Sequence, residues 1–363
     1  MEQRDAVIVG AGPAGSTCAW KLRQAGLDVL VLDRQPFPRD KTCAGWITPE
    51  VLEALEIIPE HYGAHRVIEP IVGFRVGVIG GRAVDLFYDR PVSYGIRRPE
   101  FDQFLIERSG AEFRPATHVA SLLRDGAVWI LDGQISSPMV VGAGGHFCPV
   151  ARMLNPHAGV EAVVATREAE VEVDPGGAWP ARAGVPEFYF APDFKGYGWV
   201  FRKGRYVTVG LGRRDLHGLP DHLQRFLQFL RATGRLPDVG SATWRGHAYL
   251  LYGSSLRRTV VDGVLLAGDA AGCAYPRSGE GILAAVESGL LAADTIVRAS
   301  GDYRSDRLDS YRRGIEGLFG PPKPSRGLLR AVPESLAHRV GRHLVGLPWF
   351  ARHVVLERWF LHQ

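Results

Sequence analysis

Three glycines near the amino terminus have the spacing that holds a dinucleotide by its phosphates. Gly10, Gly12 and Gly15 form a GxGxxG pattern within "GAGPAG". In this pattern the first glycine permits a tight turn, the second lets a pyrophosphate approach the backbone, and the third lets a helix pack closely on a strand. Asp33 follows at a position where an acid accepts hydrogen bonds from a ribose. These residues predict a dinucleotide-binding site.

A second stretch places one carboxylate, Asp269, among small residues. "AGDAAGCAYPRSGEG", Ala267 to Gly281, follows the apolar run "GVLLAG" and leads into "GEGILAAVESGLLAADTI", which has helical spacing. So few large side chains indicate that something approaches the backbone closely. Asp269 would bind a sugar-like hydroxyl, and the helix start would lie against an electron-rich ring. FAD is long enough to reach both this stretch and the glycine turn, so we predict FAD as the cofactor.

These residues need a strand, a turn and a helix to position them. "DAVIVG" at 5–10 and "DVLVLD" at 28–33 are apolar, β-branched runs, and the segment between them has helical spacing and ends in Gly26. This order predicts a βαβ unit. Short strand-like runs recur at about 66–97 and 165–255. The predicted fold class is therefore α/β: a Rossmann-like, doubly wound FAD-binding domain with an inserted, mostly antiparallel β-sheet domain and a short helical C-terminal tail.

The length of 363 residues fits two lobes. We predict a discontinuous FAD-binding domain (1–65, 98–164 and 256–320), a substrate-binding sheet domain (66–97 and 165–255) and a basic, aromatic helical tail (321–363). The tail begins with "PPKPSRG", which is typical of a linker.

The net charge of +4 is concentrated at the carboxyl end. Residues 321–363 hold seven Lys or Arg against two acids, so the first 320 residues are close to neutral. This distribution, without any nucleic-acid-binding motif, argues against a nucleic-acid partner. No apolar run is long enough to span a bilayer, and the start shows no secretory signal. We expect a cytoplasmic protein with reduced cysteines, and no His or Cys spacing predicts a metal site.

The tail also carries aromatic residues at helical spacing. Trp349, Phe350, Trp359 and Phe360, together with arginines, suit a peripheral contact with a membrane surface. The alternative is that these residues pack over the substrate cavity or form a subunit contact. The sequence leaves both open.

Three motifs together resemble a known superfamily. "GAGPAG" with Asp33, "RRPEFD" around Arg98, and "GVLLAGDAAGCAYPRSGEGI" resemble the FAD-dependent oxidoreductases that include aromatic hydroxylases, flavin halogenases and geranylgeranyl reductases. "FPRDKTCAGWITPEVLEAL" and "YGWVFRKGRYVTVGLG" are similar to segments of the geranylgeranyl reductase-like subgroup. One departure is "GAGG" at 142–145, where the family usually has an acid, so the role of that acid does not transfer to this chain.

The resemblance implies that Asp269 binds the ribityl chain of FAD and that Arg98 lies near the pyrophosphate or ribityl region. The full set of predicted cofactor-binding residues is Gly10, Gly12, Pro13, Ala14, Gly15, Asp33, Arg34, Cys43, Ala44, Gly45, Arg98, Asp269, Gly279, Gly281 and Ile282. The residues predicted to line a substrate cavity are Tyr197, Trp199, Phe201 and Tyr275. Cys43 and Tyr197 are the predicted catalytic residues, with Lys41 as a further candidate proton donor. For Cys43, Tyr197 and Trp199, packing in the core is the alternative.

The function that the resemblance implies is reduction of carbon–carbon double bonds in a prenyl or other hydrophobic substrate by hydride from reduced flavin. Electrons would come from NAD(P)H or another external reductant, such as a separate reductase or ferredoxin. The alternative is an FAD-dependent monooxygenase that hydroxylates or epoxidises an aromatic or polyketide-like compound. A halogenase and an electron-transfer flavoprotein are less favoured.

Overall fold

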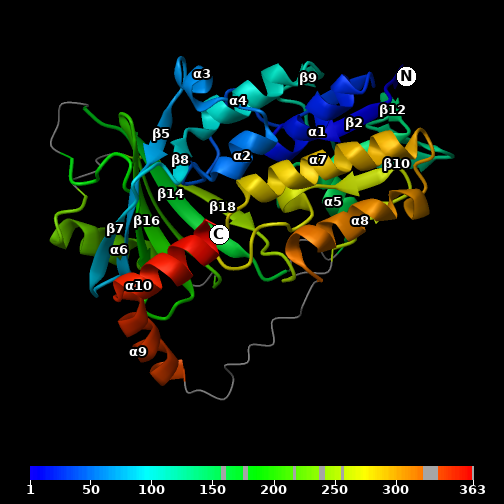
Figure 1. The fold of residues 1–363 in the computed structure, drawn as a ribbon. Helices are drawn as coiled ribbons and strands as arrows, with labels where there is room; N and C mark the ends of the chain where they lie inside the picture. Colours follow the sequence, from blue (N-terminus) through cyan, green and yellow to red (C-terminus); the bar gives the residue numbers. More distant parts are fainter. Residues whose placement is uncertain are drawn as a thin grey trace. The chain divides into compact units, whose positions relative to one another are not determined.

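The computed structural model describes residues 1–156, 161–174, 179–215, 218–236, 242–254, 257–321 and 334–361. Residues 322–333, which include most of the predicted linker, lie outside the described residues. The chain folds into two compact units, each assembled from separate stretches of sequence (Figure 1). Unit 1 consists of 1–40, 99–162 and 249–325, and unit 2 of 41–98, 163–248 and 326–363.

Unit 1 is built on a six-stranded sheet. Its strand order is β19-β20-β13-β2-β3-β9, and all neighbours are parallel except the pair β19 and β20. The strands are β2 (Ala6–Val9), β3 (Val29–Leu32), β9 (Glu112–Arg114), β13 (Met139–Gly142), β19 (Val260–Val261) and β20 (Val264–Leu266). The helices are α1 (Pro13–Gln24), α4 (Arg98–Arg108, whose first residue belongs to unit 2), α5 (Pro149–Leu154), α7 (Ile282–Ala299) and α8 (Ser305–Phe319).

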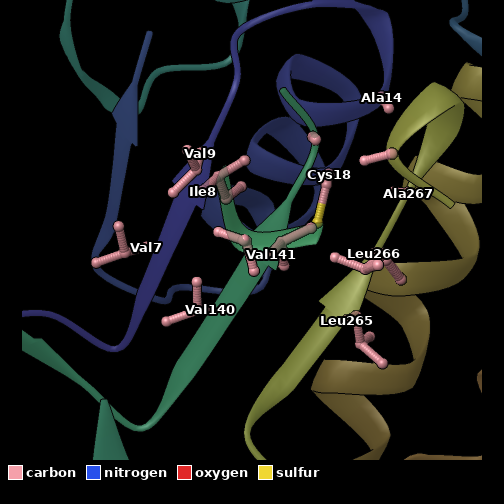
Figure 2. Close-up of a cluster of buried hydrophobic side chains, with 14 of the residues drawn as sticks. Val7, Ile8, Val9, Ala14, Cys18, Val140, Val141, Leu265, Leu266 and Ala267 are labelled. Atoms are coloured by element: carbon pink, nitrogen blue, oxygen red, sulfur yellow. The ribbon is translucent and has the colours of Figure 1, made fainter. Parts of the chain in front are cut away.

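The central strands of this sheet are apolar along their whole length because both faces are covered. Figure 2 shows side chains of β2, β13 and β20 meeting those of α1 in one cluster, in which Ile8, Val141 and Leu266 are fully buried. A second, four-stranded sheet in the order β1-β12-β11-β10 adds apolar residues to the same core. Its strands are β1 (Glu2–Gln3), β10 (Leu122–Asp125), β11 (Val128–Leu131) and β12 (Ile135–Ser137).

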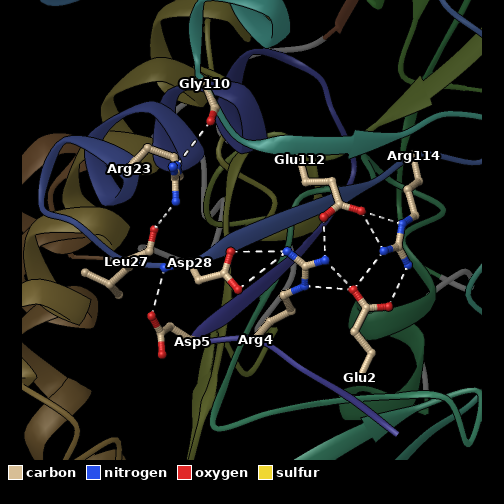
Figure 3. Close-up of polar contacts among 9 residues, drawn as sticks. All are labelled: Glu2, Arg4, Asp5, Arg23, Leu27, Asp28, Gly110, Glu112 and Arg114. Carbon is tan, nitrogen blue, oxygen red and sulfur yellow. Dashed lines mark hydrogen bonds and ion pairs between the residues drawn. The ribbon is translucent and has the colours of Figure 1, made fainter.

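Arginines and carboxylates join the N-terminal strand to β9 of the six-stranded sheet. Arg4 contacts Glu2 and Glu112 and lies 3.1 Å from Asp28, and Arg114 lies 2.7 Å from Glu2 (Figure 3). Hydrogen bonds from Arg114 and Arg4 lower the pKa of Glu2 to about 2. The network fixes β1 beside the edge of the six-stranded sheet.

Unit 2 is built on a seven-stranded sheet in the order β18-β14-β17-β16-β15-β6-β7. Most of its pairs are antiparallel, and β15 with β6 is parallel. The strands are β6 (Gly73–Val78), β7 (Ala83–Phe87), β14 (Val164–Glu172), β15 (Glu187–Phe190), β16 (Gly196–Lys203), β17 (Tyr206–Arg213) and β18 (Arg245–Tyr249). A small sheet of β4 (Trp46–Ile47), β8 (Ser93–Ile96) and β5 (Ile68–Ile71), and helices α2 (Pro49–Ala54), α3 (Pro59–Gly63) and α6 (Leu219–Ala232), complete this part. The predicted fold class is confirmed.

The two faces of the seven-stranded sheet carry different cores. On one face, aliphatic side chains such as Val200 and Val209 pack against α6. The other face is aromatic: Phe74, Phe188 and Trp199 cluster there with Trp46 of β4. We call this second surface the aromatic face.

The C-terminal tail is helical and forms part of the core of unit 2. It consists of α9 (Glu334–Val345), α10 (Pro348–Phe350) and a π-helical stretch, η3 (Ala351–Phe360). Phe360 is 1% exposed, and its ring lies 5.0 Å from Phe188 and 5.5 Å from Trp46, whereas Trp349 is 68% exposed. The end of the tail therefore completes the aromatic cluster.

The boundaries between the units differ from those expected from composition. Residues 41–65 belong to unit 2, as do residues 326–363, which the sequence analysis treated as a separate tail. None of the helices in the described part of the chain combines the length and the apolar character that a bilayer-spanning helix needs.

Candidate functional site

Three neighbouring strands of unit 1 end at the same edge of the sheet. The amide of Ala143, just after β13, donates to Val9 of β2, and the amide of Ala267, just after β20, donates to Gly142. The glycine turn, the "GAGG" segment and the Gly268–Asp269 step therefore leave the sheet side by side. The carboxyl ends of parallel strands are where open α/β sheets bind their ligands.

The glycine turn has room for backbone and for little else. Gly10 has φ +115°, and a Cβ there would overlap the backbone of Ala143. A Cβ at Gly15 would overlap the carbonyl oxygen of Gly10, so this glycine lets α1 pack against the turn. Among the described residues no side chain caps the first turn of α1, which leaves its N–H groups for a ligand. The predicted positions Pro13 and Ala14 form this first turn.

Asp33 directly follows β3 and reaches back to the turn. Its Oδ2 accepts the Ala11 N–H at 2.9 Å, and its Oδ1 accepts the Gln35 N–H at 2.9 Å. A carboxylate has about four acceptor sites, so this buried acid keeps capacity for ribose hydroxyls. Its neighbour Arg34 is exposed.

Arg39 is a site residue that the sequence analysis did not select. Its guanidinium lies 3.0 Å from the fully buried carboxylate of Asp102 and 3.9 Å from that of Asp33. A Cβ at Gly12 would lie 3.3 Å from the Arg39 guanidinium. The structure thus holds a fixed positive charge beside the glycine turn, where a pyrophosphate needs one. Asp102 belongs to the quoted "RRPEFD" motif, but no sequence signal pairs it with Arg39.

Asp269 lies in a short 3₁₀ turn, η1 (Gly268–Ala270), at the end of β20 and is partly exposed. A Cβ at Gly268 would lie 3.1 Å from the Ala14 Cβ, and one at Gly289 of α7 would overlap the Ala14 carbonyl oxygen. The small residues around Asp269 therefore let α7 and the end of β20 approach the start of α1. The stretch around Asp269 is therefore rich in glycine and alanine partly because helices and strands pack closely there. The sequence had suggested a bound ligand as the reason.

The start of α7 lies next to Asp269. The position of a Cβ at Gly281 is 3.6 Å from Asp269 Oδ1, and Ile282 begins the helix and is buried. Glu280, which is buried, accepts the Leu283 N–H at 2.7 Å, so its carboxyl caps the helix. Burial raises the pKa of Glu280 to about 7.

His146 follows the "GAGG" segment and is buried. Its Nδ1 has no hydrogen-bond partner within the described residues. Burial lowers its pKa and Arg257 acts in the same direction, while Glu161 and Asp269 oppose them. A buried ring nitrogen without a partner, in the electrostatic field of Asp269, fits a site that binds a polar group. Together with the glycine turn and Arg39, these features fit FAD.

The predicted contact segment Cys43–Gly45 belongs to unit 2, where buried charges hold it. Lys203 is almost fully buried and donates through Nζ to the carbonyl oxygens of Ala44 at 3.0 Å and Ile96 at 3.2 Å. Glu168 accepts the Cys43 N–H. Neither Lys203 nor Glu168 belongs to the residues predicted from the sequence.

The four residues predicted to line a substrate cavity divide between the units. Tyr197, Trp199 and Phe201 alternate along β16 and project from the aromatic face. Trp199 and Phe201 are buried, and Tyr197 is half-buried. Tyr275 belongs to unit 1, where its hydroxyl lies 3.2 Å from Glu287 and its ring 5.1 Å from Phe319. Arg98, the first residue of α4, is buried.

Comparisons with known proteins agree with this geometry. A family model described as an FAD binding domain matches residues 3–315. A geranylgeranyl diphosphate reductase of Rhodobacter capsulatus is 31% identical over 306 residues, which are 80% of this chain and 74% of that protein. A digeranylgeranylglycerophospholipid reductase of Methanocaldococcus jannaschii is 29% identical, over 85% of this chain and 81% of that protein. A crystal structure of a geranylgeranyl bacteriochlorophyll reductase-like protein from Thermoplasma acidophilum has a TM-score of 0.73 at 21% identity, over 96% of this chain and 88% of that one.

Proposed function

The chain belongs to the FAD-binding domain family, in the group that contains the geranylgeranyl reductases, and on this premise we propose that it reduces carbon–carbon double bonds of a prenyl or other hydrophobic substrate. Bound FAD, once reduced, supplies the hydride. The relatives named above as geranylgeranyl and digeranylgeranylglycerophospholipid reductases support this choice over the other chemistries of the superfamily.

In this proposal the cofactor is held by the residues of the sheet edge in unit 1. The glycine turn and the uncapped start of α1 bind the pyrophosphate, with Arg39 as an added positive charge. Asp33 accepts from the ribose, and Asp269 accepts from the ribityl chain. Cys43 to Gly45, Arg98, Gly279 and Gly281 remain proposed contacts.

The observation that carries the proposal is the aromatic face of unit 2. The Tyr197 ring lies 6.0 Å from that of Phe188, 5.9 Å from that of Trp199 and 5.6 Å from that of Phe360. Tyr197 is the half-buried member of this otherwise buried cluster. We infer that an isoprenoid chain lies against the Tyr197 side of the aromatic face, where apolar rings exclude water.

Cys43 and Tyr197 remain proposed catalytic residues. The Cys43 sulfur accepts the Gly45 N–H at 3.4 Å, and the Cys43 amide donates to Glu168, so the thiol has a fixed orientation. Tyr197, a half-buried residue of the aromatic face, contributes a hydroxyl. Either group can hold a proton for a substrate that lies on this surface.

NAD(P)H or a separate reductase or ferredoxin would supply the electrons. Peripheral contact with a membrane is also part of the proposal, because a prenyl lipid resides there. Trp349 supports it, since this large aromatic side chain is exposed next to His353 and one turn from Arg352. Phe360 does not, because it is buried in the core.

The proposed reaction is tested by single turnover without oxygen. The holoprotein is reduced with dithionite, mixed with geranylgeranyl diphosphate, a geranylgeranylated glycerolipid or menaquinone, and followed by flavin absorbance and product mass. We expect the flavin to reoxidise and the lipid to gain hydrogen. A monooxygenase would instead need oxygen and add an oxygen atom to its substrate. An electron carrier would leave all three lipids unchanged and reoxidise only with a protein partner, and either result would reject the proposal.

A further inference from the structure

Two carboxylates of β14, Glu168 and Glu170, lie on the aromatic face of unit 2. The register pairs Glu168 with Gly210 of β17, and Gly210 with Trp199 of β16. Since side chains alternate between the faces of a strand, Glu168, Glu170 and Trp199 project to the same side. Acidic side chains are unusual on a buried, aromatic surface, because burying a charge is costly unless the charge is paired.

Gly210 brings the Trp199 indole against Glu168. A Cβ at this position would overlap the indole ring and would lie 2.7 Å from the Glu168 Cβ. Because Gly210 has no side chain, the Trp199 indole can lie over β17 and approach Glu168. Glu168 therefore lies beside Trp199, a residue of the aromatic face on which we place the substrate.

The two carboxyl groups have opposite surroundings. Glu170 lies 3.0 Å from Lys203 Nζ, 2.8 Å from Arg97 Nε and 3.2 Å from the Thr208 hydroxyl. Burial acts to raise its pKa, but Lys203 and Arg97 outweigh burial, so the pKa is lowered. Glu170 is thus an ionised partner of two cations.

Glu168 is 6% exposed, and its Oε1 accepts the Cys43 amide. Its Oε2 is buried and has no hydrogen-bond partner in the described ranges, and the same holds for Trp199 Nε1 and Trp46 Nε1. Burial raises the pKa of Glu168 to about 7. The Cys43 amide, Lys203 and Lys41 oppose the increase and Glu170 adds to it. Neighbouring acids with pKa values pushed apart mark one as a permanent charge and the other as a proton carrier.

We propose that Glu168 holds, and delivers to the substrate, the proton that reduction of the double bond consumes. The proposal rests on the function proposed above. One alkene carbon receives the hydride. The other forms a C–H bond with the proton of the Glu168 carboxyl group as the π bond breaks. Glu168 becomes a carboxylate near Lys203 and takes up a new proton from water, and the external reductant restores the flavin.

The test compares Glu168→Gln with Glu172→Gln. The amide side chain of E168Q keeps an oxygen that can accept the Cys43 N–H but cannot supply an acidic proton. Glu172 lies on the same strand, has a side chain that is 55% exposed, and controls for the amide substitution. In the anaerobic single turnover we expect E168Q to slow product formation about 100-fold or more, the usual contribution of a general acid, with E172Q unchanged. FAD content should equal that of the wild type in both variants.

A second measurement does not depend on turnover. Infrared difference spectra between pH 6 and pH 8 should show a protonated carboxyl band in wild-type protein and E172Q that is absent from E168Q. Glu280 also has a raised pKa, but it is present in all three proteins and cancels in the comparison. The wild-type turnover rate should fall as the pH rises through about 7, and the E168Q rate should not.

The outcomes separate the two proposals. Wild-type protein that reduces no alkene rejects the proposed function, and this inference with it. Wild-type turnover combined with full E168Q activity rejects the inference alone. The inference alone is also rejected if the wild-type infrared difference spectrum contains no protonated carboxyl band that E168Q lacks. The wild-type spectrum can be recorded whether or not the variant folds well.

Discussion

Phe360 provides the sharpest test of the C-terminal tail as a structural element. Its side chain is almost completely buried, and its ring centroid lies within 5.0–5.6 Å of those of Phe188, Trp46 and Tyr197. Truncating a buried Phe to Ala typically costs about 3–5 kcal/mol, because apolar burial is lost and a cavity remains. Three aromatic contacts disappear as well, so we expect Phe360→Ala to destabilise unit 2 by about 4 kcal/mol.

The matched control is Trp349→Ala, which removes a larger aromatic side chain from the same tail. Trp349 is 68% exposed, so we expect a change of no more than about 0.5 kcal/mol. Urea-induced unfolding of the full chain, followed by near-ultraviolet circular dichroism, measures both. If the two variants unfold at the same urea concentration, the tail does not complete the aromatic core and the assignment of Phe360 is wrong.

Further predictions concern the cofactor and pH. Asp269→Ala should lose FAD during purification, because a ribityl contact is removed. The control Asp306→Ala changes an exposed acid of α8 and should keep FAD. Flavin absorbance per mole of protein measures both. Arg39→Met should likewise weaken FAD retention by removing the charge beside Gly12, and equal retention in Arg39→Met and Arg313→Met, which changes an exposed arginine of α8, would contradict this role. The folded protein binds the Glu168 proton more tightly than the unfolded chain, so the wild type should lose stability relative to Glu168→Gln as the pH rises from 4.5 to about 7. The loss is at most about 3 kcal/mol by urea unfolding, and a difference that does not change with pH would count against a raised pKa.

The sequence predicted the glycine turn because its requirements are local. Gly10 has a positive φ, and Gly15 has no room for a Cβ beside the carbonyl group of Gly10. Both requirements appear in the sequence as glycines at a fixed spacing. The sequence also predicted Asp33 and Asp269 as acids that follow apolar runs. The α/β fold class followed from the same runs, because parallel strands covered on both faces are apolar throughout.

Pairs that join distant stretches could not be predicted. Nothing in the sequence indicates that Arg39 meets Asp102, or that Lys203 holds the Ala44 carbonyl group. The "TREAEVE" pattern around Glu168 alternates acids with other residues, which usually indicates a solvent-facing side. In the structure that side carries the aromatic core, because β17 and β16 pair beside β14 in a register that the local pattern does not contain.

The sequence by itself determined where the backbone leaves no room for side chains and predicted a nucleotide there, because steric exclusion and strand ends are properties of a few neighbouring residues. Only the tertiary structure decided which charges are buried, which aromatic residues form a surface, and that Phe360 lies in the core of unit 2. Burial depends on strands and helices that are far apart in the chain, and it changes both the pKa of an acid and the energetic value of an aromatic ring.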